Sequence, residues 1–440
     1  MPFEEEIAHI TREHFGIRPG ISADTETIFR ADNPTEFDRM KADFDAGLLK
    51  HRDPPSVMRR CFVGPKFAVF LLCAYPVEEI QNIPPQLRRY YPVCTTEEIR
   101  RLDSPKSAED VLLRLRADEI VNNIRLFRVF LKRREVSGQS WSLSSHFSNG
   151  QFESYLLNLP EEKQRICAPV AAGTAFLLHP NGVCVSTPWG PVIVVSESLE
   201  NYLYYMNVFL LTLDSEETEQ QESTQALFIA IRTMILTETP DFDLDPRGLA
   251  PEPVNERARS LARTQMDFVV GHEYAHILCG HVRGIRLTAP SVFPLPPPKQ
   301  PRIFSPAQKQ EFAADLGSLL NPGWGKQQIV PYVYAVHFFF YGLDLLEEVT
   351  EYLHPKRQAG PHPAARDRLL NLRAGLVRHG LFDEKQYGDA SAMKTTFRRI
   401  VKLRRTLRGM LPKIDDRIRM YGSMYLSSNT SAPRLDRIHY

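Results

Sequence analysis

The segment from Gly271 to His281, with the sequence GHEYAHILCGH, constrains the chain more than any other stretch. It contains the pattern HExxH, in which His272 and His276 are four residues apart. In an α-helix, residues at this spacing lie on one face, so both imidazoles can bind the same Zn²⁺ ion. Glu273 can then accept a proton from a water molecule at that ion, because zinc lowers the pKa of such a water to about 7. The segment therefore predicts a zinc centre on a helix.

The flanking residues favour a helix around this segment. Asn255 is a suitable N-cap, and Glu256 follows it in the first turn, where the helix dipole favours a negative charge. No proline occurs between Arg257 and Leu278, and Gly280 offers a place for the helix to end. We therefore expect one long helix that carries both histidines. The alternative is an ordinary helix with two polar histidines, and a third metal ligand would argue against it.

A candidate for the third ligand lies on a second predicted helix. Ser305 and Pro306 suit the N-cap and the first position of that helix, and Glu311 lies 35 positions beyond His276. Two histidines and one glutamate form a donor set of catalytic zinc, which keeps a fourth position open for water. Asp315, on the same helix face as Glu311, can accept the N–H of a zinc-bound imidazole. Without the histidine motif, both acids would be interpreted as solvated residues of an amphipathic helix.

Together these motifs resemble those of the gluzincin metallopeptidases. In particular they resemble the branch with the CAAX prenyl proteases and the bacterial heat-shock membrane protease, which has a Glu-x-x-Ala-Asp pattern like residues 311–315. The segment Pro188–Val195 is similar to the edge strand that pairs with extended substrate in that branch. The segment from His362 to Arg368 is similar to its His-Pro pair with an arginine six positions after the histidine. The resemblance covers roughly residues 170–380.

The resemblance implies a catalytic centre with one Zn²⁺ ion per chain. The ion would be bound by the two histidines of the motif and by Glu311, with Glu273 as the catalytic base. Asp315 and Arg368 would lie around the ligands, and His362 would be a second catalytic residue that contacts the substrate oxyanion. That branch is usually embedded in membranes, whereas the phage-exclusion proteases and the repressor-cleaving proteases of mobile elements are soluble relatives with similar motifs.

The composition is that of a folded globular protein. The 440 residues are 43% hydrophobic and 24% charged, and the formal net charge of +1 gives no general attraction to nucleic acid or anionic membranes. A chain of this length favours two domains, and a change in character places them at residues 1–160 and 161–440. Six scattered cysteines, and an acidic N-terminus without an apolar segment, are typical of a cytoplasmic protein with reduced thiols.

The expected fold class is α+β. We expect a mostly helical, zincin-like metallopeptidase domain with a small sheet beside the active-site helix, preceded by an N-terminal mixed α/β region. Besides the metal-binding segments, the residue patterns predict strands at 60–63, 67–72, 170–178, 183–185 and 191–195, and helices at 3–15, 35–49, 107–134, 197–213, 216–236, 331–353 and 364–377.

Three other segments bear on partners. Residues 289–306 form a Pro-rich connection of extended character, which is either a solvated loop or a docking segment. Residues 393–410 form a basic helix, for which a solvated face is the favoured interpretation and a nucleic acid or another anionic partner the alternative. Residues 329–346 are apolar but contain Pro331 and Asp344, so we expect a buried core helix and no membrane span.

Other catalytic classes lack support. A metzincin requires a glycine three positions and a histidine six positions after His276, but Cys279 and Val282 occupy these places. His281 is therefore interpreted as a helix-end residue and Cys279 as a small buried residue. The chain contains no G-x-S-x-G, P-loop or G-x-G-x-x-G motif, which leaves serine hydrolases and nucleotide-binding proteins without support.

The sequence thus predicts a zinc-dependent endopeptidase that hydrolyses a peptide bond of a protein substrate. The substrate would pair with the strand Val192–Val195. The alternative is a zinc-stabilised sensor or interaction module, or a latent protease, with residues 1–160 or the basic helix as the surface for a regulatory partner. A fourth protein ligand such as Cys279 would favour this alternative, and an open position for water would favour the peptidase.

Overall fold

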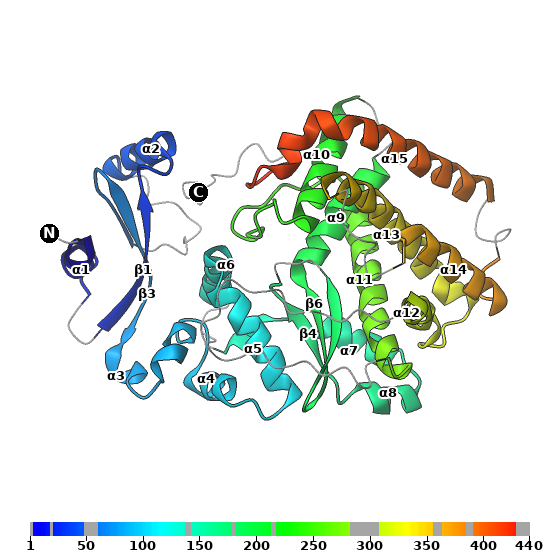
Figure 1. Ribbon diagram of the computed structural model, residues 1–440, viewed down its shortest axis with the longest axis horizontal. Helices are drawn as coiled ribbons and strands as arrows, with labels where there is room; N and C mark the ends of the chain where they lie inside the picture. Colours follow the sequence, from blue (N-terminus) through cyan, green and yellow to red (C-terminus); the bar gives the residue numbers. More distant parts are fainter. Residues whose placement is uncertain are drawn as a thin grey trace.

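The computed structural model describes residues 3–17, 21–47, 60–136, 142–177, 181–212, 217–281, 308–354, 363–383 and 390–427. The Pro-rich connection 289–306 and His362 lie outside these ranges. The described chain is mostly helical with two small sheets, which confirms the expected α+β class, while the specific zincin fold stays a prediction. Figure 1 shows one sheet among the N-terminal elements and the other beside the long helices of the C-terminal half.

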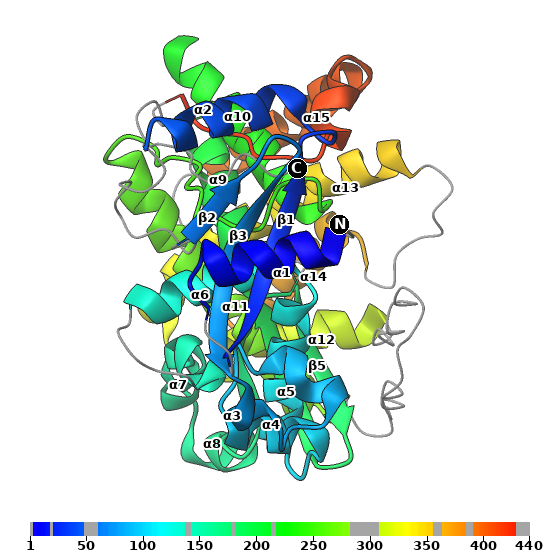
Figure 2. The same cartoon turned by 90° about the vertical axis from the view of Figure 1, so that its left-hand side faces the viewer.

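The N-terminal elements are α1 (Phe3–Glu13), β1 (Ile21–Phe29), α2 (Pro34–Asp45), β2 (Arg60–Val63) and β3 (Phe67–Pro76). The strands form an antiparallel sheet in the order β1-β3-β2, and Figure 2 shows α1 lying across it. Successive side chains of β3 point to opposite faces. Phe67 and Val69 therefore pack with α1, whereas Ala68 and Phe70 pack with α2. Strand β1 was not predicted, because its alternating residues are largely polar.

Short helices follow: α3 (Val77–Ile80), the 3-10 helix η2 (Pro85–Tyr90), α4 (Thr96–Asp103), α5 (Ala108–Val121), α6 (Ile124–Val136), the 3-10 helix η3 (Leu143–His146), α7 (Gly150–Leu157) and α8 (Glu161–Cys167). Helix α5 begins at the capping box of Ser107 and Asp110. The prediction of one helix over 107–134 is wrong. Asn123 ends it, because its side chain caps the first turn of α6 by accepting the backbone N–H groups two and three positions on.

The second sheet contains β4 (Ala171–Ala175), β5 (Gly182–Thr187) and β6 (Gly190–Ser196), in the order β4-β6-β5. Strand β4 is parallel to β6, and β5 is antiparallel to it. The prediction that Val192–Val195 lies in an edge strand is therefore wrong, because β6 has a neighbour on each side. An uninterrupted apolar run is typical of a strand buried on both faces, as these four residues are. Strand β5 lies at the edge and has one strand partner among the described residues.

The packing connects the short helices to this second sheet. Helix α5 contacts both β4 and β6 through a shared apolar cluster. In α6, Arg125 forms a buried ion pair with Asp241, which lies in the loop before the helix of the HExxH motif. Two apolar clusters lie within the N-terminal sheet and its helices, whereas α5, α7 and α8 share clusters with later elements. The division expected near residue 160 stays a prediction.

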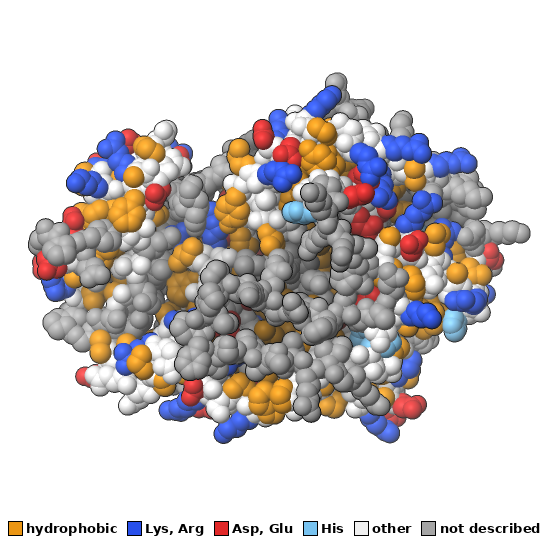
Figure 3. All heavy atoms as spheres, viewed as in Figure 1, with side chains coloured by type: hydrophobic (Ala, Val, Ile, Leu, Met, Phe, Trp, Pro, Cys, Tyr) orange, Lys and Arg blue, Asp and Glu red, His pale blue; other side chains and the backbone are white. Residues whose placement is uncertain are grey.

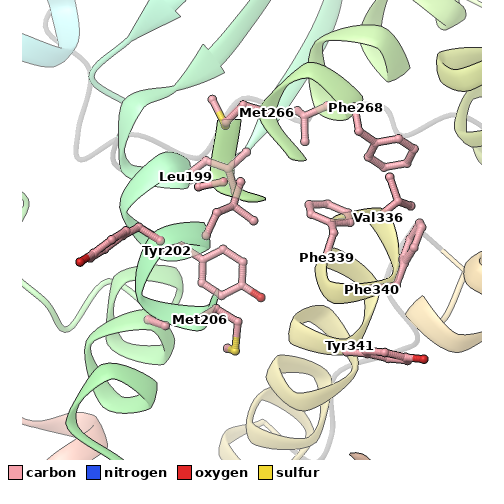
Figure 4. Packing of buried hydrophobic residues seen from close by; sticks show 14 of the residues in the cluster. Leu199, Tyr202, Met206, Met266, Phe268, Val336, Phe339, Phe340 and Tyr341 are labelled. Carbon is pink, nitrogen blue, oxygen red and sulfur yellow. The ribbon is translucent and has the colours of Figure 1, made fainter. Parts of the chain in front are cut away.

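The C-terminal half contains α9 (Glu197–Leu211), α10 (Glu217–Met234), α11 (Val254–Leu278), α12 (Gln308–Leu320), α13 (Lys326–Leu353), α14 (Ala365–Arg378) and α15 (Ala390–Arg419). Helix α11 runs through its middle and contacts α9, α12, α13 and β5 (Figure 1). Figure 4 shows the aromatic core at these contacts, where Tyr202 of α9, Phe268 of α11 and Phe340 of α13 are buried. Helix α11 is therefore held on several sides, which makes it a rigid support for the motif.

The start of α11 differs from the prediction. The helix begins at Val254, one residue before the expected cap. The side chain of Asn255 instead contacts Glu252 at 2.6 Å and accepts a hydrogen bond from the hydroxyl of Tyr204 at 2.9 Å. The carboxylate of Glu252 accepts the backbone N–H of Glu256, so an acid outside the helix satisfies a donor of the first turn. Asn255 is thereby free to connect α11 to α9.

Helix α13 is long and apolar enough to cross a membrane, but 67% of its most apolar 18-residue segment is buried inside the structure. This burial agrees with the core helix that we expected. Its acidic residues bind the basic helix α15: Arg404 pairs with Asp344 at 2.6 Å and also with Glu348, which pairs with Arg408 as well. Two arginines of the predicted basic segment thus bind acids of the same chain. Figure 3 shows further basic side chains on the surface near α15.

Candidate metal centre

Helix α11 carries His272 and His276 one turn apart, and both side chains are buried. Gly271 permits a close approach of α7 at this turn, because a Cβ there would lie 2.6 Å from the ring of Tyr155. The hydroxyl of Tyr155 donates to the carbonyl of Ser318 in α12 at 3.0 Å. Helix α7 therefore contacts both helices that supply the motif residues and fixes their relative position.

Helix α12 brings Glu311 and Asp315 to α11, and both carboxylates are almost fully buried. The two helices approach closely at Gly317, where a Cβ would lie 3.0 Å from the Cβ of Ala275. On the other side of α12, Gly375 of α14 leaves room for a leucine of α12. Because distances between helices depend on the size of the residues at the contact, these small residues place the carboxylates against the histidines.

The three predicted ligands face one another. The Nε2 atoms of His272 and His276 are 3.1 Å apart, and each lies 3.6 Å from a different carboxylate oxygen of Glu311. Their ligand atoms all lie within 4.8 Å, so the group could hold a metal ion. With metal–ligand bonds of about 2.0–2.1 Å, a tetrahedral zinc site places its donors roughly 3.3–3.4 Å apart. The separation of the two Nε2 atoms is close to this value, and the carboxylate of Glu311 lies at a similar distance from both, so the group could hold such an ion.

His272 is held by an anion that is itself held by a cation. Its Nδ1 lies 2.9 Å from Asp315, and Arg368 donates to both oxygens of that carboxylate at 2.6 and 2.8 Å. Burial raises the pKa of Asp315, but Arg368 and His272 outweigh burial and lower this pKa to about 2. The ionised Asp315 accepts a hydrogen bond from the Nδ1–H of His272. A neutral His272 then directs its Nε2 lone pair at the other two predicted ligands.

His276 has a different partner, because its Nδ1 lies 2.9 Å from Nδ1 of His281. Burial and the neighbouring His272 lower the pKa of His276 to about 3. The imidazole is therefore neutral at pH 7, as a metal ligand must be. The two histidines of the motif thus have unlike surroundings, one beside a carboxylate and the other beside a second imidazole.

Glu273 faces the edge strand β5. A Cβ at Gly182 would lie 2.8 Å from Val269 and 3.0 Å from the Oε1 atom of Glu273, so the glycine allows the strand to lie against the carboxylate. Burial and the charge of Glu273 both raise the pKa of the Cys184 thiol in the same strand. The candidate base is therefore next to β5, one of the two edge strands of this sheet.

The structure brings together the predicted residues His272, Glu273, His276, Glu311, Asp315 and Arg368. His362 lies outside the described residues. Cys279 ends α11 and is exposed, which contradicts its interpretation as a buried residue, and it is not in the ligand group found among the described residues. Sequence reasoning missed the contacts of His281 and Gly182. The position of His281 directly after a helix-ending glycine could have indicated the first of them.

Comparisons of the chain with protein-family models, with curated protein sequences and with solved structures found no significant match. The features that bear on function are therefore the donor set, the burial of that set and the hydrogen bonds around it.

Proposed function

We propose that this chain is a zinc-dependent endopeptidase that hydrolyses a peptide bond of a protein substrate. The observation that carries the proposal is the buried group of His272, His276 and Glu311, with Glu273 next to the first ligand in the chain. Two imidazoles and one carboxylate are a donor set of catalytic zinc, and three protein ligands leave a coordination position for water. Structural zinc sites, in contrast, are closed by four protein ligands.

Each residue has a distinct role in this proposal. The two histidines and Glu311 would hold the ion, which supplies Lewis-acid chemistry and lowers the pKa of a water molecule. Glu273 would accept the proton of the attacking water and pass it to the amine that leaves. Asp315, fixed by Arg368, would keep the proton of His272 on Nδ1, so that the metal-facing nitrogen stays unprotonated.

The edge of β5 is the proposed place for an extended substrate. An edge strand presents unpaired backbone N–H and C=O groups, to which a peptide can add as a further strand. Gly182 places the beginning of this strand beside Glu273, so a peptide on β5 would carry its backbone past the candidate base. Backbone pairing of this kind needs few side-chain contacts, which suits a protein substrate of varied sequence.

The test compares the wild-type chain with Glu273→Gln, which keeps the size of the side chain and removes the base. After purification without chelators, zinc content is measured in both proteins, and both are incubated with a proteome whose new N-termini are then identified. We expect about one zinc per chain in both, because Glu273 is not a ligand, and cleavage by the wild type alone. This result would also identify substrates.

Three other outcomes would contradict parts of the proposal. Zinc in both proteins without cleavage by either would favour a latent protease or a zinc-stabilised interaction module. Equal cleavage by both proteins would show that Glu273 is not the base. The absence of zinc from the wild type would remove the central claim.

A further inference from the structure

The end of α11 brings a third histidine to the candidate metal centre. Gly280 has a φ of 71°, its N–H donates to the carbonyl of Ile277, and the N–H of His281 donates to the carbonyl of His276, both at 2.9 Å. These two bonds form a Schellman motif, in which the left-handed glycine turns the chain back over the last helical turn. The motif usually packs two apolar side chains there. In this chain both positions are histidines.

The turn places the two imidazoles in direct contact. The ring centroids of His276 and His281 are 5.1 Å apart, and their Nδ1 atoms are 2.9 Å apart. Two neutral imidazoles at this distance share one hydrogen, so one Nδ1 donates and the other accepts. If His281 donated, the proton of His276 would be on Nε2, which is the atom that faces His272 and Glu311. Only the opposite arrangement leaves that nitrogen able to bind a metal.

We infer that His281 is a positioning residue for the metal centre: its Nδ1 accepts the Nδ1–H of His276 and thereby presents Nε2 of His276 to the ion. This inference rests on the proposed metal site and adds a residue to it. His281 contacts the far side of the His276 ring, which separates it from the ligand atoms, so it acts on the ligand and is not a ligand itself.

The charge of the site gives a reason for an imidazole in this position. Glu273, Glu311 and Asp315 are already buried around the two ligand histidines, and Arg368 is the cation that pairs with Asp315. A second orienting carboxylate beside His276 would add a further buried anion, which is unfavourable unless it is paired. A neutral imidazole accepts the same hydrogen bond without that charge. The Schellman turn supplies this imidazole from the same helix.

The experiment measures the zinc affinity of the full chain by competition with a fluorescent chelator. His281→Ala removes the acceptor and is expected to weaken zinc binding by about 10–100-fold, the usual loss for a group that orients a metal ligand. His281→Asn places an amide oxygen near the position of Nδ1, so its affinity should return close to that of the wild type. His379→Ala is the matched control, since His379 is also next to a left-handed glycine at a helix end but is exposed.

Several outcomes would overturn the inference. One is that His281→Ala binds zinc as tightly as the wild type. Another is that His281→Asn binds zinc as weakly as His281→Ala while the metal-free proteins unfold at the same temperature. That result would indicate that His281 acts through packing and not through its hydrogen bond. X-ray absorption of the zinc-loaded wild type should show two imidazole ligands, and three would make His281 a ligand.

A metal-free measurement keeps the inference separate from the proposed function. Nitrogen-15 NMR of labelled histidines reports which nitrogen of His276 carries the proton. We expect Nδ1–H in the wild type and a mixture of both tautomers in His281→Ala. A proton on Nε2 in the wild type would overturn the inference, even for a chain that binds no zinc. Zinc binding that depends on His281, together with an absence of proteolysis, would instead leave the inference intact and remove the peptidase.

Discussion

Zinc should stabilise the chain against thermal unfolding, and Glu311→Gln should remove most of that effect. The donors come from α11 and α12, which meet only in the folded state, so the unfolded chain offers no comparable site. At a free zinc concentration of about 100 times the dissociation constant, binding adds about 2.7 kcal/mol to the unfolding free energy. An unfolding entropy of about 2.1 cal/mol/K per residue over 440 residues converts this into a rise of about 3 °C in the melting temperature.

The effect of Glu311→Gln follows from the position of the carboxylate. Its two oxygens each lie 3.6 Å from a different ring nitrogen, so an amide would turn its NH₂ group toward one of the histidines and would carry no charge. If zinc affinity falls by about 100-fold, the same zinc concentration adds only about 0.4 kcal/mol, which is less than about 0.5 °C. Differential scanning calorimetry of chelator-treated protein, with and without added zinc, measures both shifts.

Glu273→Gln is the matched control for this measurement. It makes the same chemical change beside His272, but at a residue outside the ligand group. We therefore expect the full zinc-induced rise in this variant. An equal rise in Glu311→Gln and the wild type would refute the role of Glu311 as a ligand. Loss of the rise in Glu273→Gln would refute the distinction between base and ligand.

Three other predictions concern the support of the site. Gly317→Ala should lower the unfolding free energy by about 1–3 kcal/mol and weaken zinc binding, because its Cβ would press on Ala275; Gly409→Ala, with nothing near its Cβ, should stabilise by up to about 1 kcal/mol in the same urea unfolding assay. Burial raises the pKa of Asp267 to about 6, above its unfolded value near 4. The folded state therefore loses stability at pH 7, where this carboxyl is ionised, and the loss disappears below about pH 4, where it is protonated in both states. Asp267→Asn should therefore stabilise by about 1–2 kcal/mol at pH 7, and urea unfolding at pH 4 should show no gain. Arg404→Met should cost about 2 kcal/mol by removing the cation that pairs with Asp344 and one of the two that pair with Glu348, whereas a helix used only for an external anion would tolerate the change in a thermal melt.

Local patterns in the sequence predicted much of the secondary structure. The capping box at Ser107 and the apolar run at Phe67 each depend on residues close together in the chain, and both occur where expected. The predictions failed at two asparagines whose side chains have other partners than expected. Asn255 binds α9 and so does not cap α11. Asn123 caps a new helix in the middle of an otherwise continuous helical pattern.

The arrangement of strands could not be read from local patterns alone. The run Val192–Val195 is apolar at every position, which suits a central strand better than an edge strand. The resemblance to an edge strand led to the opposite prediction. Its two neighbours are β4, which precedes it by some 15 residues and is parallel to it, and the hairpin strand β5. Parallel pairing of β4 with β6 is a non-local contact that no short motif indicates.

The candidate site also contains some contacts that local sequence patterns predict and others that depend on the tertiary structure. The histidine pair follows from four-residue spacing on one helix, and the partner of His276 follows from the turn that ends the same helix. Glu311 and Asp315 reach the histidines only because α12 crosses α11 at the close contact of Gly317 with Ala275. One histidine of the candidate site is therefore oriented by a local contact and the other by a tertiary one. A change at the helix crossing moves Glu311 and Asp315 together, whereas the contact of His276 with His281 stays within α11. Mutations at the crossing and at His281 can therefore test the two groups of contacts separately.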